Sequence, residues 1–429
     1  MKFEIVPANL ATQQPTLPIL LVVFGLATAL GALFCWLVLL ICHHWHIMSL
    51  PKRHHIHQTP VPRLGGVGIF LAFFVVSAFF FRPVNDYEKH VYVGLIAASV
   101  LIVIIMAYDD IRGLAPLPRL IIQTVAALIA MFPAGYHGTL IEVLHNPLQT
   151  SNQGQLPLAL WLAIPFTWFW IVGMMNTINW IDGVDGLAGG VVTITALVMA
   201  AISWLLGQPA AALLCAALAG ATLGFLPLNW HPARLFMGDS GAMFLGLSLA
   251  VLANVGGAKL ATMLLLLGLP ILDTARVIIM RLLHRHSPLH FDLTHLHHRL
   301  LIGGMSQQRI ALLFYSMTGC FGAVAISAAY LQTRAGLWSV RIHIWQGFYL
   351  SVSELPTLAG LGLALVLTQI IWRYAARRRS RSSLPPGASS AFHTLESATA
   401  SSTLSGSARG PSDSTITPGP PERLAASKS

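Results

Sequence analysis

The chain has 429 residues, of which 55% are hydrophobic and only 9% are charged, and its formal net charge is +10. Soluble domains have about 25% charged residues, so this composition excludes an ordinary soluble protein and indicates a polytopic membrane protein. The four Cys residues form no CxxC pair, and they indicate neither a disulfide framework nor a thiolate metal site.

Apolar segments long enough to cross a bilayer follow one another along the chain. A transmembrane helix needs about 20 mostly apolar residues, and this criterion predicts an all-α polytopic membrane protein with about eleven transmembrane helices. We expect the end of the ninth span, which contains Pro270, Asp273 and Arg276, to leave the lipid. The predicted spans are residues 18–41, 64–82, 91–107, 117–133, 157–175, 187–206, 210–227, 241–255, 258–280, 310–331 and 356–373.

The distribution of Lys and Arg predicts the orientation, because these residues concentrate on the cytoplasmic side. Nineteen of the 25 lie in the tail after residue 372 and in four loops, 42–63, 108–119, 228–240 and 273–309. We therefore predict that these loops are cytoplasmic and that the amino terminus is outside. Residues 1–375 form the predicted membrane domain. Residues 376–429, rich in Ser, Pro, Gly and Thr, are predicted to be a disordered cytoplasmic tail.

Polar stretches follow the first, third, fifth, seventh and ninth predicted spans, so all five lie on the predicted cytoplasmic face. "RLGG", residues 63–66, supplies a cation and a flexible turn before the second span. Asp109 and Asp110 end the third span, where two adjacent anions are unfavourable unless they share a cation or keep one proton. The pair therefore indicates a divalent metal site or a general base. The alternative is a solvated helix end with Arg112 and Arg119 as partners.

The segment "NTINWIDGVDGLAGG", residues 176–190, follows the fifth span. Asn176, Asn179 and Asp182 are spaced by three and would lie along one side of a helix. Their oxygen atoms suit Mg²⁺, which takes one or two protein ligands together with waters and phosphate oxygens. Polar capping with glycine-mediated helix packing is the alternative.

A second acidic motif, "FMGDSG", places Asp239 just before the apolar helix that starts near Gly241. The free N–H groups of that helix could bind a diphosphate, and Phe236 offers a flat face for a base. The alternative is that Asp239 or Ser240 only caps the helix.

The last polar loop is rich in histidine. Such a loop could bind zinc, lie on the membrane surface, or hold phosphates through imidazole and guanidinium groups. Because Cys is absent and three carboxylate-bearing loops share the same face, we favour phosphates. The residues concerned are His284, Arg285, His286, His290, His295, His297, His298 and Arg299.

Together the loops predict a cytoplasmic pocket for Mg²⁺-assisted phosphoryl transfer between a soluble nucleotide-linked donor and a lipid phosphate. Their motifs resemble, in order, those of the polyprenyl-phosphate N-acetylhexosamine-1-phosphate transferases, the superfamily that includes phospho-N-acetylmuramoyl-pentapeptide transferase. The resemblance covers residues 50–310. The matching motifs are "HQTPVPRLGG", "YDDIRGL", "NTINWIDGVDGLAGG", "LNWHPARLFMGDSGAMFLG", "PILDTARV" and "HLHHRL".

The resemblance implies transfer of a sugar phosphate from a UDP-sugar to undecaprenyl or decaprenyl phosphate, with release of UMP, in the bacterial inner membrane. It implies that Asn179 and Asp239 hold Mg²⁺ or Mn²⁺, and that Asp109 or Asp110 is the base. The implied catalytic residues are Asp109, Asp110, Asp182, Asp185 and His297. The implied substrate ligands are Asn176, Asn229, Phe236, Arg63, His295, His298 and Arg299. Gly113 occupies a position that is often charged in the family, so that position is not a catalytic candidate here.

Within this superfamily, "THLHHRLL" resembles the N-acetylglucosamine-1-phosphate transferases, so UDP-N-acetylglucosamine is the expected donor. Another UDP-N-acetylhexosamine or UDP-N-acetylmuramoyl-pentapeptide is the alternative donor. A non-catalytic membrane transporter is the alternative of another class, although transporters usually place charges near the bilayer midplane. We expect membrane lipid as a partner and no nucleic acid, and the formation of a homodimer is left undecided.

Overall fold

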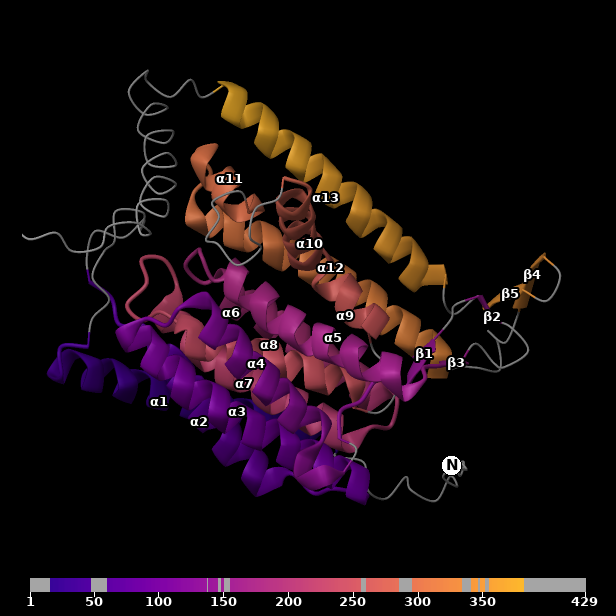
Figure 1. Ribbon diagram of the computed structural model, residues 1–429, viewed down its shortest axis with the longest axis horizontal. Coiled ribbons are helices and arrows are strands. Elements are labelled where there is room, and N and C mark those ends of the chain that lie inside the picture. Colours follow the sequence, from indigo (N-terminus) through magenta and orange to yellow (C-terminus); the bar gives the residue numbers. More distant parts are fainter. Residues whose placement is uncertain are drawn as a thin grey trace, which may run out of the picture. The chain divides into compact units, whose positions relative to one another are not determined.

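The computed structural model describes residues 16–47, 60–136, 138–145, 148–149, 155–255, 260–284, 295–333, 341–345, 348–351 and 355–381. This part of the chain is almost entirely helical (Figure 1). Its α-helices are α1 Leu17–His44, α2 Gly65–Phe80, α3 Asp86–Arg112, α4 Pro116–Met131, α5 Leu160–Ile181, α6 Leu187–Leu205, α7 Pro209–Asn229, α8 Gly238–Asn254, α9 Leu260–Leu266, α10 Gly268–Leu283, α11 Leu296–Ile302, α12 Gln307–Thr333 and α13 Leu355–Arg381. Apart from the last two residues of α13, these helices lie in one compact unit, Met1–Arg379.

Five short strands and one 3₁₀ turn complete the described part. The turn, η2 Pro133–Gly135, follows α4. The strands β1 Val143–His145 and β3 Gln155–Pro157 pair antiparallel, and β2 Leu148–Gln149 pairs with β5 Phe348–Ser351, which also pairs with β4 Arg341–Trp345.

The prediction of an all-α polytopic membrane protein is confirmed, and each of the eleven predicted spans coincides with described helix. Within the described ranges, eight helices are individually long and apolar enough to cross a membrane. The helices α2 and α8, with 16 and 17 residues, are shorter than a full span. Eleven crossings and the orientation therefore stay predictions.

The ninth predicted span is broken into α9 and α10, which meet at an angle of 86°. Proline lacks an N–H group and disrupts a helix interior, but it is tolerated in a first turn, where the N–H groups have no intrahelical partner. Pro270 lies in the first turn of α10, so the chain starts a new helix there. The expectation that the end of the span leaves the lipid stays a prediction.

Helix α8 lies in the middle of the bundle. All but one of its residues are buried, and it packs mainly against α3, α5 and α2. A helix that is apolar on every side needs such a position, because it offers no face to water. Its amino terminus, where Asp239 lies, is therefore surrounded by the ends of other helices.

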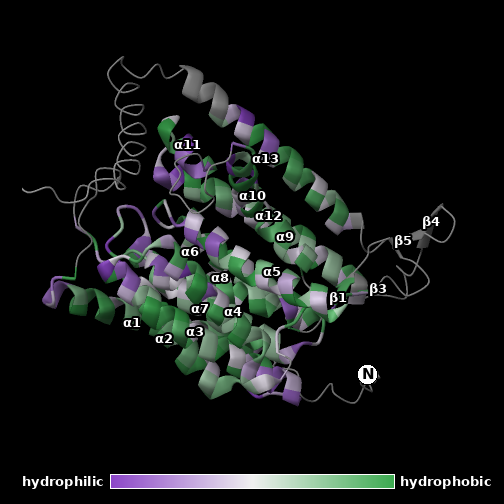
Figure 2. Cartoon of the chain, viewed as in Figure 1, coloured by the Kyte–Doolittle hydropathy of each residue, from purple (hydrophilic) through white to green (hydrophobic). Residues whose placement is uncertain are grey.

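The polar motifs lie at one end of the bundle. The carboxy ends of α3, α5 and α7 and the amino ends of α2, α4, α6 and α8 meet there, while the strands lie at the other end (Figure 1). Figure 2 shows helices that are hydrophobic along most of their length and hydrophilic residues on α11 and the neighbouring loops. Carboxylates and amides can thus face water while the helices stay in lipid.

The orientation of this end can be measured by labelling single cysteines with a membrane-impermeant thiol reagent. Lys89 and Arg234 are exposed and lie at opposite ends of the bundle. After replacement of the four native Cys, Lys89→Cys should react in intact cells, whereas Arg234→Cys should react only once the membrane is permeabilised. Labelling of Arg234→Cys from outside would contradict the predicted orientation.

Candidate active site

The centre of the candidate site is the Asp239 carboxylate at the start of α8. Its Oδ2 accepts a hydrogen bond of 2.7 Å from an Arg119 terminal nitrogen on α4. Its Oδ1 accepts a hydrogen bond of 3.0 Å from Asn179 Nδ2 on α5. Groups that are 60 and 120 residues away in the sequence therefore converge on one carboxylate.

Arg119 also holds Asp109, so a single guanidinium group bridges two carboxylates. Its Nε lies 2.8 Å from Asp109 Oδ2, and its second terminal nitrogen lies 3.2 Å from Oδ1. The backbone N–H of Leu114 donates to the same carboxylate, whose side chain is fully buried. The sequence interpretation considered Arg119 only as a partner at a solvated helix end. The sequence did offer a signal for a functional role of Arg119, because it is a charged residue at the start of an apolar helix, at the membrane boundary.

Asp110 points elsewhere and caps α8. Its Oδ1 accepts from the backbone N–H of Asp239 at 2.8 Å, and its Oδ2 accepts from Ser240 Oγ at 2.8 Å and from Ser240 N–H at 3.1 Å. Successive residues of an α-helix diverge by about 100°, so the two neighbouring carboxylates have different partners, Arg119 for Asp109 and the start of α8 for Asp110. The sequence prediction that the pair forms a metal site or a general base stays a prediction. The anion at the α8 amino terminus is Asp110 itself rather than a free site for a diphosphate.

The three predicted oxygen ligands of α5 have different surroundings. Asn176 donates from Nδ2 to Gln123 Oε1 at 2.9 Å and to the Val172 carbonyl at 2.8 Å, so it ties α5 to α4 one turn below Asn179. The structure therefore places this predicted substrate ligand in a helix contact. Asn179, in contrast, donates a hydrogen bond to the Asp239 carboxylate.

Asp182 follows α5 and lies within the electrostatic range of the other acidic groups. Desolvation raises its pKa, the charge of Arg63 opposes that shift, and the charges of Asp239, Asp110 and Asp185 reinforce it. The Nε of Arg63 is buried and has no hydrogen-bond partner among the described residues. Asp182 therefore lies among three other carboxylates and one arginine, a set of groups that suits a bound cation.

Asp185 and Asn229 hold the loop between α7 and α8. Asp185 Oδ2 accepts from His231 Nδ1 at 2.7 Å and from the Ala233 N–H at 3.1 Å. Asn229 accepts from the Gly186 N–H and donates to the Leu235 carbonyl, both at 3.0 Å. The resemblance implies a catalytic role for Asp185 and a substrate contact for Asn229, and in this structure both side chains bond to the loops around them. The sequence interpretation missed His231, although it stands in the quoted motif.

Phe236 is fixed through its backbone. Its N–H donates to the Pro62 carbonyl at 2.8 Å, and its carbonyl accepts from the Gly65 N–H at 2.9 Å. The "RLGG" segment is therefore paired with the "FMGDSG" segment. The Phe236 side chain stays partly exposed, as a surface for base stacking requires.

Three of the six predicted histidines lie at α11: His295 precedes the helix, and His297 and His298 are in its first turn. The His297 side chain is buried, and neither ring nitrogen has a hydrogen-bond partner in the described part of the chain. Burial and the neighbouring His298 and His295 lower its pKa well below the usual value, so it is neutral at pH 7. A Cβ atom on Gly183 would lie 2.7 Å from His297 Nε2, which places this imidazole against the loop that follows Asp182.

The remaining predicted ligands of this segment are arranged differently. Arg299 lies over the ring of Trp372, with its guanidinium carbon 3.7 Å from the ring centroid. His286 and His290 lie outside the described residues. Within the described ranges, no three His, Cys, Asp or Glu side chains form a metal-binding group, so the zinc alternative has no support there.

Gly238 is required where the two paired segments meet. Its φ is +75°, and a Cβ atom there would overlap the carbonyl oxygen of Arg63. We expect Gly238→Ala to lower the free energy of unfolding by about 2 kcal/mol or more and to reduce activity, because backbone strain and a clash add. Gly25→Ala is the matched control, since nothing lies within 4 Å of a Cβ there. Thermal unfolding in detergent measures both, and equal melting temperatures would contradict the prediction.

Comparison with known proteins gives consistent matches. Residues 92–257 match glycosyl transferase family 4. A probable undecaprenyl-phosphate N-acetylglucosaminyl 1-phosphate transferase of Bacillus subtilis (strain 168) is 32% identical over 294 residues, which cover 67% of this chain and 78% of that protein. The decaprenyl-phosphate N-acetylglucosaminephosphotransferase of Mycobacterium leprae is 31% identical over 347 residues, 73% and 85% of the two chains. A phospho-N-acetylmuramoyl-pentapeptide-transferase of Pelotomaculum thermopropionicum is 32% identical over 293 residues, 65% and 87%.

Proposed function

This chain belongs to glycosyl transferase family 4, and from that premise we propose that it is a polyprenyl-phosphate N-acetylglucosamine-1-phosphate transferase. It transfers N-acetylglucosamine-1-phosphate from UDP-N-acetylglucosamine to undecaprenyl or decaprenyl phosphate. UMP is released, and the lipid-linked sugar starts the synthesis of a cell-surface polysaccharide. The names of the Bacillus and Mycobacterium relatives support N-acetylglucosamine as the sugar.

One observation carries the proposal: Asp109, Arg119, Asn179 and Asp239 converge at the end of an apolar helical bundle. A lipid acceptor keeps its chain in the bilayer and offers only its phosphate at the boundary, where a water-soluble nucleotide sugar can also arrive. Carboxylates and an arginine at that boundary suit the handling of phosphates and of their metal ion. A transporter would need such charges near the midplane.

The donor atoms around Asp239 fit Mg²⁺, with Mn²⁺ as the alternative. The Asp239 side chain is 24% exposed, and a carboxylate has about four acceptor positions, of which Arg119 and Asn179 use two. The oxygen and nitrogen of an Asn amide are interchangeable by rotation, so Asn179 can present its Oδ1 as a second ligand. Bound there, Mg²⁺ would neutralise the diphosphate charge.

In the proposed reaction, an oxygen of the acceptor phosphate attacks the β-phosphorus of the UDP-sugar. The bond from that phosphorus to the bridging oxygen breaks, and UMP leaves with this oxygen. A phosphate monoester has its second pKa near 6, so the acceptor is mostly deprotonated at pH 7 and needs no strong base. Since Asp109 is fully buried and paired with Arg119, its geometry favours orientation of that arginine over proton abstraction.

The other candidate residues surround the proposed donor site. We assign Phe236 to base stacking and Arg63 to the diphosphate, beside Asp182. Asp185 and Asn229 hold the loop that carries Phe236. We assign the sugar phosphate to His297 and His298, whose rings are 4.2 Å apart. In the predicted orientation this site faces the cytoplasm of a bacterium, at the inner membrane.

The test is radiolabel transfer by purified protein from a panel of UDP-sugars into butanol-extractable lipid, with UMP release measured at graded Mg²⁺. Transfer from UDP-N-acetylglucosamine supports the proposal. Transfer only from UDP-N-acetylmuramoyl-pentapeptide, as the name of the Pelotomaculum relative suggests for that protein, would replace the sugar but keep the reaction. No UMP release with any donor would leave the transporter alternative.

A further inference from the structure

The buried carboxylate of Asp273, on α10, connects three helices. Its Oδ2 lies 2.9 Å from His295 Nδ1, and both of its oxygens accept from the Leu296 N–H at the start of α11, at 3.0 and 3.1 Å. Its Oδ1 also accepts from Trp372 Nε1 on α13, at 3.3 Å. The donors that reach this buried carboxylate come from the start of α11 and from α13, so the carboxylate joins α10 to both helices.

Trp372 is held by two arginines as well as by Asp273. The guanidinium carbons of Arg276 on α10 and Arg299 on α11 lie 2.7 and 3.7 Å from the centroid of its ring. Each guanidinium group is attracted by the electron-rich ring face. Thus α10 contributes a hydrogen-bond acceptor and an arginine to the contact with Trp372 on α13, and α11 contributes an arginine.

The residues that Asp273 holds lie next to the candidate active-site residue His297 in the sequence. His295 and Leu296, which Asp273 holds, directly precede His297. The rings of His295 and His297 are stacked with centroids 5.8 Å apart, and His297 lies against Gly183 in the loop after Asp182. Since His297 itself has no hydrogen bond among the described residues, only its helix and its packing fix its place.

We propose that Asp273 and Trp372 are positioning residues for sugar-phosphate transfer, which makes α13 part of the catalytic unit. They fix α11 so that His297 faces the loop after Asp182. The inference rests on the proposed function for its kinetic consequence, but the placement of α11 can be measured without it.

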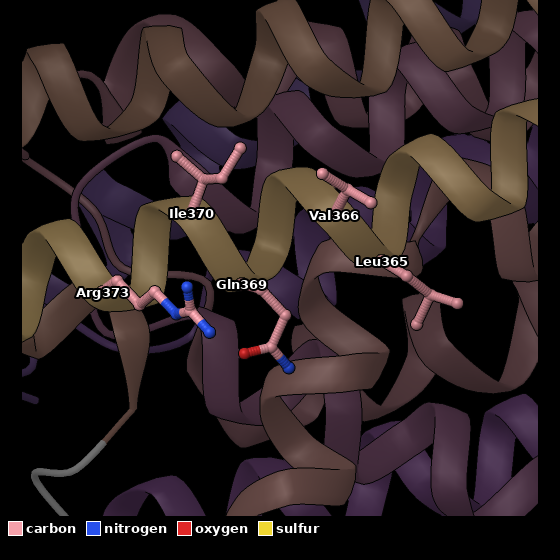
Figure 3. Close-up of a pocket in the computed structure, with 5 residues that line it drawn as sticks. All are labelled: Leu365, Val366, Gln369, Ile370 and Arg373. Carbon is pink, nitrogen blue, oxygen red and sulfur yellow. The ribbon is translucent and has the colours of Figure 1, made fainter.

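The informative variant is Trp372→Phe, which keeps a ring for the two arginines but loses the indole N–H. Asp273→Asn is the second variant, because its single acceptor oxygen cannot serve Leu296, His295 and Trp372 together. Ile370→Ala is the matched control, since this residue is exposed on the same helix and lines an outer groove with Gln369 and Arg373 (Figure 3). All three variants keep the Mg²⁺ ligands.

We expect Trp372→Phe and Asp273→Asn to lower kcat/KM for the UDP-sugar about 10-fold or more, because small misplacements of binding groups cause large losses in reaction rate. The Mg²⁺ concentration for half-maximal activity and the melting temperature should stay near those of the wild type and of Ile370→Ala. Hydrogen exchange should rise in residues 295–302 but not in α1 or α7.

A second measurement separates positioning from general damage. In a His297→Ala background, Trp372→Phe should lower kcat/KM for the UDP-sugar less than about twofold, because the effects of residues that act through one group are not additive. An equal loss in both backgrounds, or exchange raised throughout the bundle, overturns the inference. Normal kcat/KM and unchanged exchange in both variants overturn it too. If the wild type transfers no sugar phosphate but exchange in residues 295–302 rises, the proposed function fails and the placement of α11 by α13 stands.

Discussion

Asp239→Asn is expected to reduce sugar-phosphate transfer by about 10²- to 10³-fold, the usual effect of removing one electrostatic contribution to a transition state. The substitution keeps the shape of the side chain but removes the charge that meets Arg119 and Asn179. The Mg²⁺ concentration for half-maximal activity should rise, because one anionic ligand becomes neutral. Asn179→Ala should change both quantities in the same direction.

The measurement is initial UMP release over a Mg²⁺ titration with purified enzyme. Asp86→Asn is the matched control, since Asp86 is an exposed carboxylate in the first turn of α3, at the other end of the bundle. Its turnover and Mg²⁺ dependence should equal those of the wild type. If Asp239→Asn has near-wild-type turnover at limiting Mg²⁺, Asp239 is not the metal ligand.

Arg119→Ala should reduce turnover by about 10³-fold, as expected when an arginine that stabilises phosphoryl transfer is lost. The same variant should bind Mg²⁺ more tightly. Arg119 now places its positive charge 2.7 Å from Asp239 and 2.8 Å from Asp109, where it opposes a nearby divalent cation. Opposite changes in turnover and in Mg²⁺ affinity distinguish this role from that of a metal ligand.

Arg119→Lys should recover only a small part of the activity, because an ammonium group cannot bridge both carboxylates as the planar guanidinium group does. Arg112→Lys, at an exposed position in the last turn of α3, is the matched control and should be active. Isothermal titration with Mn²⁺ and UMP-release kinetics measure the two effects. Unchanged turnover in Arg119→Ala would remove this arginine from the mechanism.

The sequence by itself determined the all-α membrane class, the approximate helix positions and the family. Hydropathy along the chain is enough for the first two, because a backbone in lipid must satisfy its hydrogen bonds within each helix. Spans such as 18–41 and 187–206 therefore match α1 and α6 closely. The sequence also identified the motifs "YDD" and "FMGDSG", because charged residues are rare in such an apolar chain.

The tertiary structure alone decided which of these polar groups meet and what each one touches. Helical rotation separates Asp109 from Asp110, so one carboxylate faces Arg119 and the other caps α8. Asn176 and Asn179 differ by less than one turn, yet one bonds to Gln123 and the other to Asp239. Residue spacing cannot show this, because the partner depends on which helix packs beside each turn. The bond between Asp273 and Trp372 joins residues 99 positions apart, and only the packing of α13 against α10 and α11 brings it about.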